Sequence, residues 1–367
     1  MSMKRNHITL MIKPSSAACN LACDYCFYQD TASHREVGQR PFMQEDVMMA
    51  IITKGLAEAN NCSFVFQGGE PSLIGLPFYE KFVQAVNRLN TEGASIHYAF
   101  QTNGMHINEA WATFFKRNNF LVGVSFDGSP RLNDMHRFDS QGTKSARSVL
   151  DGIALLRKYE AEFNVLGVVT NELAQNVDLM WNYMTGHGHR YLQFIPCMES
   201  LEGFSTKPFL TPENYALFLK RLFDLWFEAW EKGNPVSIRF FDNLVGMLAG
   251  YPPESCDMAG VCSIQYVVES DGSIYPCDFY CDDASCLGNL LTDDFIVLDE
   301  KRSEMRFIEA SPNSIDACAS CPWKLLCRGG CKRYRDEGGY RFCSTMLEFY
   351  PYVIKRLEHV ARTLVRQ

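Results

Sequence analysis

Short apolar runs alternate with longer amphipathic segments along the first two thirds of the chain. Short runs rich in β-branched and aromatic residues predict six strands, at residues 7–13, 63–67, 96–101, 121–125, 163–169 and 191–195. Segments with helical periodicity predict six helices, at residues 44–60, 77–90, 108–117, 143–159, 173–186 and 212–232. Because each strand is followed by a helix, the pattern predicts an α/β fold with parallel strands and crossover helices.

Polar motifs follow the first four predicted strands. They are a loop with three cysteines at residues 19–26, GGEP at 68–71, QTNG at 101–104 and SFDG at 125–128. In parallel α/β folds the loops after the carboxyl ends of the strands build the site. We therefore expect these four loops to surround one cavity.

The cysteine loop has the strongest chemical signal. Cys19, Cys23 and Cys26 form a C-x3-C-x2-C array. Three thiolates leave one of the four ligand positions of a 4Fe–4S cluster open. Structural zinc is the alternative, but it prefers four closed ligands. The spacing, with Tyr25 before the last cysteine, resembles the signature of radical S-adenosylmethionine (SAM) enzymes, in which SAM occupies the open iron.

This resemblance implies further contacts with SAM. Glycines allow a close backbone approach or a positive φ, and GGEP resembles the family's segment that meets the amino group of SAM, with an ordinary turn as the alternative. The residues expected to contact SAM are Tyr25, Gly68, Gly69, Glu70, Asn103, Ser125 and Arg137, the last through a bidentate pair with the SAM carboxylate. Tyr28 and Gln67 are expected to face the substrate, with core packing as the alternative for the aromatic residues.

Ten of the fifteen cysteines lie beyond Ser255, which indicates a small cysteine-rich domain that metal helps to stabilise. A hairpin is expected at residues 265–277, where Asp271-Gly272 is typical of a two-residue turn. The spacing of these cysteines resembles that of the SPASM domain. The resemblance implies one auxiliary cluster on Cys256, Cys262, Cys277 and Cys331, and a second on Cys318, Cys321, Cys327 and Cys343.

Four cysteines then remain outside the three ligand sets. Cys62 and Cys197 border apolar strands and are expected in the core. Cys281 and Cys286 lie near the cluster segment, where they could compete for iron. Zinc on four thiolates per site is the structural alternative for the auxiliary sites.

Nearly the whole chain resembles the anaerobic sulfatase-maturating enzymes, through motifs that include KPSSAACNLACDYCFY, FVFQGGEPSL and QYVVESDGSIYPCDFY. The resemblance implies a partial (β/α)6 TIM barrel at residues 1–235 and a SPASM domain with two auxiliary iron–sulfur clusters at residues 236–344. A C-terminal helix at residues 345–367 is expected to pack on the barrel, because its apolar residues form one stripe.

The implied activity is oxidation of a cysteine or serine of a sulfatase to Cα-formylglycine. The resemblance implies that a 5′-deoxyadenosyl radical takes a hydrogen from Cβ, a base removes the thiol or hydroxyl proton, and an acceptor takes the second electron. The auxiliary clusters could be this acceptor or could chiefly shape the peptide pocket. Asp278, directly after Cys277, is the expected base, and a residue capping the hairpin exit is the alternative. The rival functions are another SPASM peptide maturase, forming thioethers or carbon–carbon crosslinks or epimerising a residue, and a non-catalytic iron–sulfur or zinc module.

Charge and hydropathy limit the expected partners. The net charge of −8 without a basic run argues against nucleic acid, and no segment has the apolar length of a membrane span. The N-terminus lacks a signal-peptide pattern, so a cytoplasmic location is expected. The expected partners are a peptide or unfolded sulfatase and an electron donor such as ferredoxin or flavodoxin. The connection at residues 200–208 is expected to be mobile.

Overall fold

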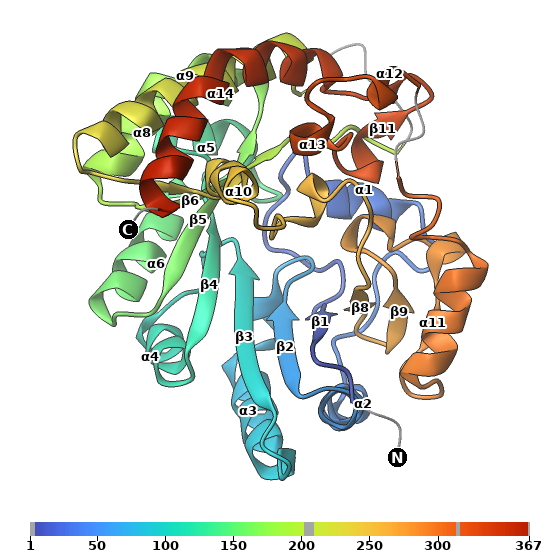
Figure 1. Ribbon diagram of the computed structural model, residues 1–367. Helices are drawn as coiled ribbons and strands as arrows, with labels where there is room; N and C mark the ends of the chain where they lie inside the picture. Colours follow the sequence, from blue (N-terminus) through green and yellow to red (C-terminus); the bar gives the residue numbers. More distant parts are fainter. Residues whose placement is uncertain (1–3, 202–208, 313–315, 366–367) are drawn as a thin grey trace. The chain divides into compact units, whose positions relative to one another are not determined.

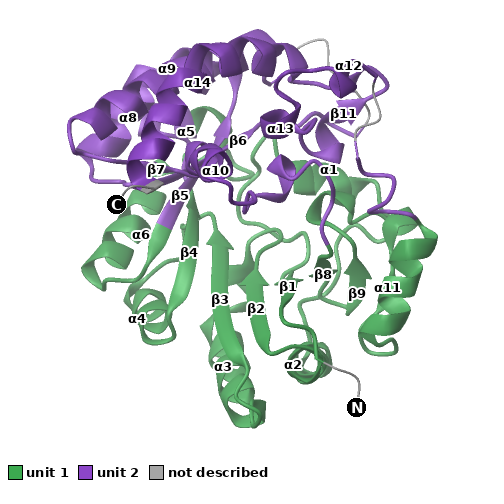
Figure 2. Cartoon of the chain, viewed as in Figure 1, with its two compact units in different colours: residues 1–125, 134–163, 264–305 green, residues 126–133, 164–263, 306–367 purple. Residues whose placement is uncertain are grey.

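The computed structural model describes residues 4–201, 209–312 and 316–365 (Figure 1). Most of the connection at 200–208 therefore lies outside the described residues. The chain divides into two compact units built from non-contiguous segments (Figure 2). Unit 1 comprises residues 1–125, 134–163 and 264–305, and unit 2 comprises residues 126–133, 164–263 and 306–367. The predicted domain boundaries at 235 and 344 stay a prediction.

Parallel strands in chain order form most of the sheet of unit 1. These strands are β1 (Ile8–Ile12), β2 (Asn61–Phe66), β3 (Ser95–Thr102) and β4 (Phe120–Ser125). All four agree with the sequence prediction within two residues. On the other side of β1, β8 (Tyr266–Val268) pairs in parallel, with Leu10 opposite Tyr266. The strands β9 (Ser273–Tyr275) and β10 (Gly288–Asn289) extend this edge in antiparallel fashion.

The helices of unit 1 include those predicted after the first four strands. They are α2 (Glu45–Glu58), α3 (Leu76–Leu89), α4 (Glu109–Arg117) and α6 (Ala146–Lys158). The sequence analysis did not predict α1 (Phe27–Ser33), α11 (Phe295–Glu304) or the 3-10 turns η1 (Pro71–Ile74), η3 (Asp278–Tyr280) and η4 (Asp283–Ser285). The helix α5 (Pro130–His136), also not predicted, has residues in both units.

Aromatic side chains fill the core between the sheet and α3 and α4. Phe66 lies on β2 with its ring 5.0 Å from that of Tyr79 and 5.0 Å from that of Phe82, both on α3. Phe100 on β3 lies 5.0 Å from Phe115 on α4. These rings are almost completely buried. Edge-to-face packing of this kind adds to the stabilisation from burial and holds the strand ends, where the polar loops begin.

The predicted hairpin forms between β8 and β9, but its turn is longer than expected. Glu269 N–H donates to Ser273 O at 2.9 Å, which leaves three residues in the loop rather than two. Gly272 N–H closes a turn on Glu269 O at 3.0 Å, and Gly272 has a φ of 86°. A three-residue hairpin needs a left-handed residue at this position, so the Asp-Gly step was informative while the predicted loop length was wrong.

Unit 2 contains most of β5 (Phe163–Val169), with β6 (Tyr191–Pro196) and β7 (Ser237–Ile238) paired in parallel in that order. Its helices are α7 (Asn171–Gln175), α8 (Val177–Gly186), α9 (Pro212–Glu231), α10 (Arg239–Leu248), α12 (Asp316–Ala319), α13 (Lys324–Cys327) and α14 (Cys343–Val365). Short elements complete it, namely η2 (Cys256–Met258), η5 (Lys332–Tyr334), β11 (Arg335–Asp336) and β12 (Gly339–Tyr340).

One helix predicted in unit 2 is divided in the structure. The segment predicted as a single helix at 173–186 breaks at Asn176, which has φ −123° and ψ 35°. The Asn176 side chain donates to Glu172 O at 2.8 Å, and this local bond competes with the helical pattern.

The C-terminal helix α14 packs on other helices of unit 2. Arg356 pairs with Asp224 of α9 at 2.8 Å, and the ring of Phe349 lies 6.1 Å from that of Phe241 in α10. Thr345 Oγ1 donates to Pro212 O at 2.7 Å, at the beginning of α9. The predicted helix is confirmed and begins two residues earlier than expected.

Candidate functional site

The three-cysteine loop connects β1 to α1 in unit 1. Lys13 N–H donates to Val268 O at 2.8 Å, and turns at residues 13–18 fold the loop back. Cys26 N–H donates to Cys23 O at 3.1 Å, and α1 begins directly after Cys26. All three cysteines are half-buried. The loop is therefore a locally closed structure that places three thiols before one helix.

Donor groups surround the first thiol. Leu21 N–H lies 3.4 Å from Cys19 Sγ, and Asn103 Nδ2 lies 3.8 Å from it. Burial raises the pKa of the Cys19 thiol to about 12, and the nearby Glu70, Cys23 and Cys26 add to the rise, against the lowering effect of the Leu21 N–H. Such clustered thiols ionise only beside a strong cation. The residues present thus fit an iron–sulfur cluster.

The two glycines of GGEP hold the second polar loop against the cysteine loop. Gly68 has a φ of 126°, and a Cβ on Gly69 would lie 2.1 Å from Ala18 O. Gly69 N–H donates to Ser16 O at 2.9 Å, and Glu70 N–H donates to Ala18 O at 2.7 Å. The close approach that these glycines allow is therefore to the backbone beside Cys19.

Glu70 connects the second and third polar loops. Its carboxylate is completely buried and accepts from Thr102 Oγ1 at 2.8 Å, Asn103 N–H at 2.7 Å and Ser72 N–H at 3.0 Å. Asn103 then donates to Asn20 Oδ1 on the cysteine loop at 2.7 Å. The structure thus brings Gly68, Gly69, Glu70 and Asn103 together around the cysteine loop, and their contacts with SAM stay a prediction.

Tyr25 and Arg137 also lie together. The guanidinium carbon of Arg137 lies 5.5 Å from the centre of the Tyr25 ring, and the His136 ring lies 5.4 Å from it. His136 Nδ1 lies 3.0 Å from the Asp24 carboxylate on the cysteine loop. The sequence analysis missed His136, although it is adjacent to Arg137. Ser125, at the end of β4, accepts from Gln101 Nε2 at 3.3 Å.

The two residues expected to contact substrate have partners within unit 1. Gln67 Nε2 lies 2.8 Å from Met11 Sδ. Tyr28 is only 2% exposed, its hydroxyl donates to Glu269, and its ring faces the Lys13 ammonium at 3.5 Å. A substrate role for either residue stays a prediction, and core packing explains the position of Tyr28.

The predicted base, Asp278, belongs to a buried charge cluster. This cluster is defined here as Lys13, Tyr28, Arg35, Glu269, Asp278 and Cys281. Lys13 Nζ lies 2.5 Å from Asp278 Oδ1 and 3.3 Å from Cys281 Sγ. Arg35 Nη1 donates to Glu269 Oε1 at 2.9 Å. The sequence analysis singled out neither Lys13, Arg35 nor Glu269. The position of Lys13, directly after a strand and before the cysteine loop, is the signal that could have identified it.

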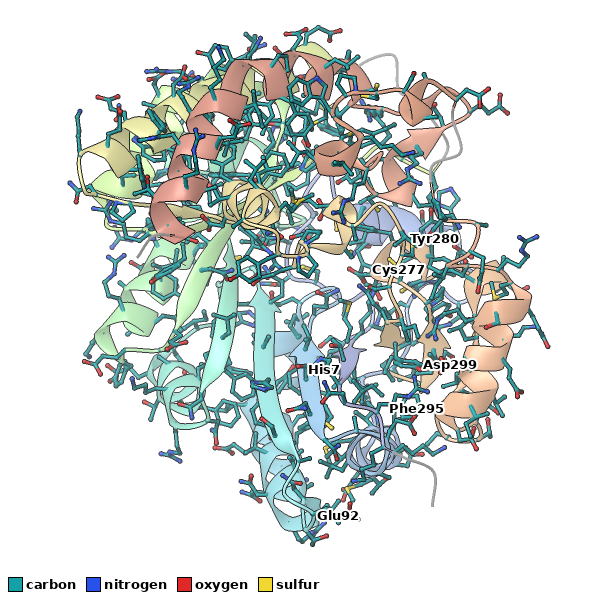
Figure 3. All side chains as sticks on the ribbon, viewed as in Figure 1. His7, Glu92, Cys277, Tyr280, Phe295 and Asp299 are labelled. Carbon is teal, nitrogen blue, oxygen red and sulfur yellow. The ribbon has the colours of Figure 1, made fainter. Side chains whose placement is uncertain are left out.

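Cys277 and Tyr280 lie on the segment that follows β9 (Figure 3). Asp278 directly follows Cys277 and begins η3. Cys277 O accepts from Tyr280 N–H at 3.0 Å and from the Cys281 thiol at 3.6 Å. Cys286 Sγ donates to Gly288 O at 3.6 Å. Cys281 and Cys286 thus have partners within this segment.

Within unit 2, seven cysteines lie in two neighbouring groups. The pKa of Cys331 is raised to about 11 by burial, with contributions from Cys256 and Cys262. The pKa of Cys327 is raised to about 11 by burial, with contributions from Cys343, Cys318 and Cys321, and these four line a cavity of about 350 Å³. The eighth cysteine of the two predicted sets, Cys277, belongs to unit 1, and the assignment of these cysteines as ligands stays a prediction.

Arg335 organises the loops that carry these cysteines. Its guanidinium donates to Gly329 O at 2.7 Å, and also to Gly330 O and Ser311 O. Ser311 Oγ in turn accepts from Cys262 N–H at 2.8 Å. The sequence analysis missed this residue, because a guanidinium that serves several carbonyls has no sequence signature.

The described part of the chain has neither a site for a single metal ion nor a membrane-spanning helix. Within residues 4–201, 209–312 and 316–365, no group of three or more His, Cys, Asp or Glu side chains is arranged to hold a single metal ion. In the same ranges no helix has both the length and the apolar character that crossing a membrane requires.

Comparison with known proteins agrees with this geometry. The radical SAM superfamily model matches residues 14–175, and the SPASM model, an iron–sulfur cluster-binding domain, matches residues 256–322. A cysteine-type anaerobic sulfatase-maturating enzyme of Clostridium novyi (strain NT) is 40% identical, with 97% of this chain and 98% of the relative covered. The chain belongs to the family of anaerobic sulfatase-maturating enzymes. A serine-type sulfatase-maturating enzyme of Klebsiella aerogenes is 30% identical, with 97% of this chain and 87% of the relative covered.

A solved sulfatase-maturating enzyme also has this fold. The structure of anSMEcpe with bound AdoMet (SAM) and the Cp18Cys peptide is 40% identical, with a TM-score of 0.91 and coverage of 98% of this chain and 99% of that one. The predicted fold class, a radical SAM fold with a SPASM domain, is confirmed. So is the prediction of an enzyme that uses SAM and iron–sulfur clusters.

Proposed function

We propose that this chain oxidises a cysteine in a sulfatase peptide to Cα-formylglycine. The observation that carries the proposal is that two functional features directly follow β1. One is the cation that pairs with the proposed base, and the other is the three-cysteine loop. The last residue of β1 is followed by Lys13, which pairs with Asp278, and then by the loop of Cys19, Cys23 and Cys26. The end of β1 would thus carry the cluster loop and also the cation that holds the carboxylate base.

Cys19, Cys23 and Cys26 would hold a 4Fe–4S cluster with one open iron. When bound there, the cluster and SAM supply a 5′-deoxyadenosyl radical. Gly68, Gly69 and Glu70 fix the loop that carries Cys19, and Tyr25 with Arg137 would provide an aromatic face and a cation for SAM, beside Asn103 and Ser125. These residues orient SAM and exclude water around it.

Asp278 is the proposed base. After Cβ of the substrate cysteine has lost a hydrogen atom, the thiol proton passes to the Asp278 carboxylate, so that the S–H bond breaks and an O–H bond forms. An auxiliary iron–sulfur cluster would be the acceptor of the second electron, and hydrolysis of the resulting thioaldehyde would give formylglycine. A base within hydrogen-bond reach typically contributes a factor of about 10² to 10⁴ in rate.

The remaining cysteines would hold two auxiliary 4Fe–4S clusters. The first set is Cys256, Cys262, Cys277 and Cys331, and the second is Cys318, Cys321, Cys327 and Cys343. A ferredoxin or flavodoxin would supply the electron for SAM cleavage, and the setting would be the cytoplasm.

Cysteine is the proposed target, because the cysteine-type relative is 40% identical and the serine-type relative 30% identical. Thioether or carbon–carbon crosslinking and epimerisation are the alternatives within SPASM enzymes. The structure of Streptococcus suis SuiB bound to the precursor peptide SuiA is only 14% identical and shows the fold alone.

The test uses the anaerobically reconstituted chain with SAM, dithionite and paired sulfatase peptides that contain cysteine or serine. Mass spectrometry should show the cysteine peptide converted to a product that has lost sulfur and two hydrogens and gained oxygen. A product that keeps its sulfur would contradict the proposal and favour crosslinking. Faster conversion of the serine peptide would contradict the assigned target.

A further inference from the structure

Lys13 occupies an unusual position for a lysine in unit 1. Its side chain is completely buried, and its main chain is fixed on both sides by Lys13 N–H to Val268 O at 2.8 Å and Ser16 N–H to Lys13 O at 3.1 Å. A buried ammonium is costly unless it is paired. The burial of Lys13 therefore requires partners that compensate for the desolvation of its charge.

Three groups surround the ammonium of Lys13. Asp278 Oδ1 lies 2.5 Å from Nζ, Cys281 Sγ lies 3.3 Å from it, and the centre of the Tyr28 ring lies 3.5 Å from it. The ring face supplies a cation–π contact and the thiol a weak acceptor. The ammonium is thus held in one place, and the carboxylate is its charged partner.

The other carboxylates of this region have their own cations. Glu269 accepts from Arg35 Nη1 at 2.9 Å and from the Tyr28 hydroxyl. Asp271 lies 2.7 Å from Arg40 Nε. Arg35 and Arg40 contact these acids directly, whereas the carboxylate in direct contact with the Lys13 ammonium is that of Asp278.

The backbone that carries Asp278 is fixed separately from its side chain. Asp278 begins η3, and the ring of the next residue, Phe279, packs against Phe27 of α1 at 4.9 Å. The Oδ1 atom of Asp278 is buried, while the side chain as a whole keeps 18% exposure. The exposed part of the Asp278 side chain therefore consists of its other atoms. The packing of the backbone does not by itself fix the rotation of the carboxylate about its side-chain bonds.

We propose that Lys13 is a positioning residue for Asp278, holding Oδ1 so that the other carboxylate oxygen faces the substrate thiol and accepts its proton. This inference rests on the proposed function. Lys13 itself gives up no proton. Burial alone would lower the pKa of Lys13, but the charges of Asp278, Cys281, Tyr28 and Glu269 raise it well above its ordinary value, which agrees with a permanent cation.

The experiment compares Lys13→Met with the wild-type enzyme on a cysteine peptide that carries deuterium at Cβ. Two quantities are measured, namely deuterium in 5′-deoxyadenosine, which reports hydrogen abstraction, and formylglycine formed per 5′-deoxyadenosine, which reports completion. We expect Lys13→Met to retain abstraction and to lose at least about tenfold in completion. Lys54→Met is the matched control, because Lys54 Nζ donates only to the Asp293 carbonyl, at 2.8 Å, among the bonds of the described residues.

Lys13→Gln provides the second variant, since its amide keeps a donor for Asp278 without the charge. It should fold where Lys13→Met fails and should restore part of the completion ratio. A crystal structure of Lys13→Met should show the Asp278 carboxylate rotated, because that variant has no donor for Oδ1. An unchanged ratio, a parallel loss of abstraction and completion, or an unmoved Asp278 would overturn the inference. Absence of formylglycine from the wild-type enzyme would instead refute the proposed function.

Discussion

Gly69 offers a severe test of how the polar loops hold the first cluster site. In Gly69→Ala the new Cβ would lie 2.1 Å from Ala18 O and 2.7 Å from two carbonyl carbons. These are backbone atoms, so no side-chain rotation relieves the clash. The Cβ of a real residue does not approach other atoms closer than 3.0 Å, so Ala18 O must move by roughly 1 Å.

The magnitude of the effect follows from the bonds that this shift strains. Overpacking of this kind costs about 1–3 kcal/mol. Each of the two strained backbone bonds, from Gly69 N–H to Ser16 O and from Glu70 N–H to Ala18 O, contributes about 1 kcal/mol. If both bonds are lost, the loop should thus lose about 3–5 kcal/mol of local stability. Cys19 follows Ala18 directly, and metal sites tolerate ligand displacements of only about 0.2 Å.

We therefore expect Gly69→Ala to lose the iron–sulfur cluster of the cysteine loop. The iron bound by the cysteines of unit 2 should remain. Iron and sulfide analysis, electron paramagnetic resonance of the reduced protein with and without SAM, and a 5′-deoxyadenosine assay measure this. Gly186→Ala is the control, because a Cβ there meets no heavy atom within 4 Å. Wild-type SAM cleavage and an unchanged SAM-dependent signal in Gly69→Ala would refute the reasoning.

Three further predictions follow from single side chains. Glu70→Gln should cost about 1–3 kcal/mol in denaturant unfolding, because three donors lose a buried carboxylate. Cys286→Ser should keep its full iron content, whereas Cys321→Ser should lose iron; equal losses would contradict the ligand sets. Burial alone would raise the pKa of Glu269, but the charges of Lys13 and Arg35 lower it below its ordinary 4.5. The stabilisation by ionised Glu269 is therefore present above pH 4.5 and lost as the pH falls through the folded-state pKa. In Glu269→Gln the free energy of unfolding should depend less on pH in this acid range. An unchanged pH dependence would contradict this.

The parts of the site that the sequence predicted well are local in the chain. The spacing of Cys19, Cys23 and Cys26 fixes their loop, and the loops of Gly68 and Asn103 follow strands with clear periodicity. These strands could be predicted because alternate positions are apolar and buried. In β1 these are positions 8, 10 and 12. Parallel pairing then brings the strand ends to one edge.

The parts that the sequence analysis missed depend on pairings between distant segments. The parallel pairing of β8 with β1 brings the segment after the hairpin beside Lys13. The hydrophobic periodicity of the sequence does not predict this pairing. The contacts between Lys13 and Asp278, and between Arg35 and Glu269, follow from that pairing. The break at Asn176 was missed for a different reason, since a side-chain bond to Glu172 overrides a continuous helical pattern.

The central claim is that three early thiols hold the iron at which SAM is cleaved, and that this cleavage drives formylglycine synthesis. The most direct measurement compares the wild-type enzyme with a variant in which Cys19, Cys23 and Cys26 are all alanine, both anaerobically reconstituted with iron and sulfide. The account predicts 5′-deoxyadenosine and formylglycine in equal amounts from the wild-type enzyme and neither product from the variant, whose auxiliary iron remains. Turnover by the variant would contradict it.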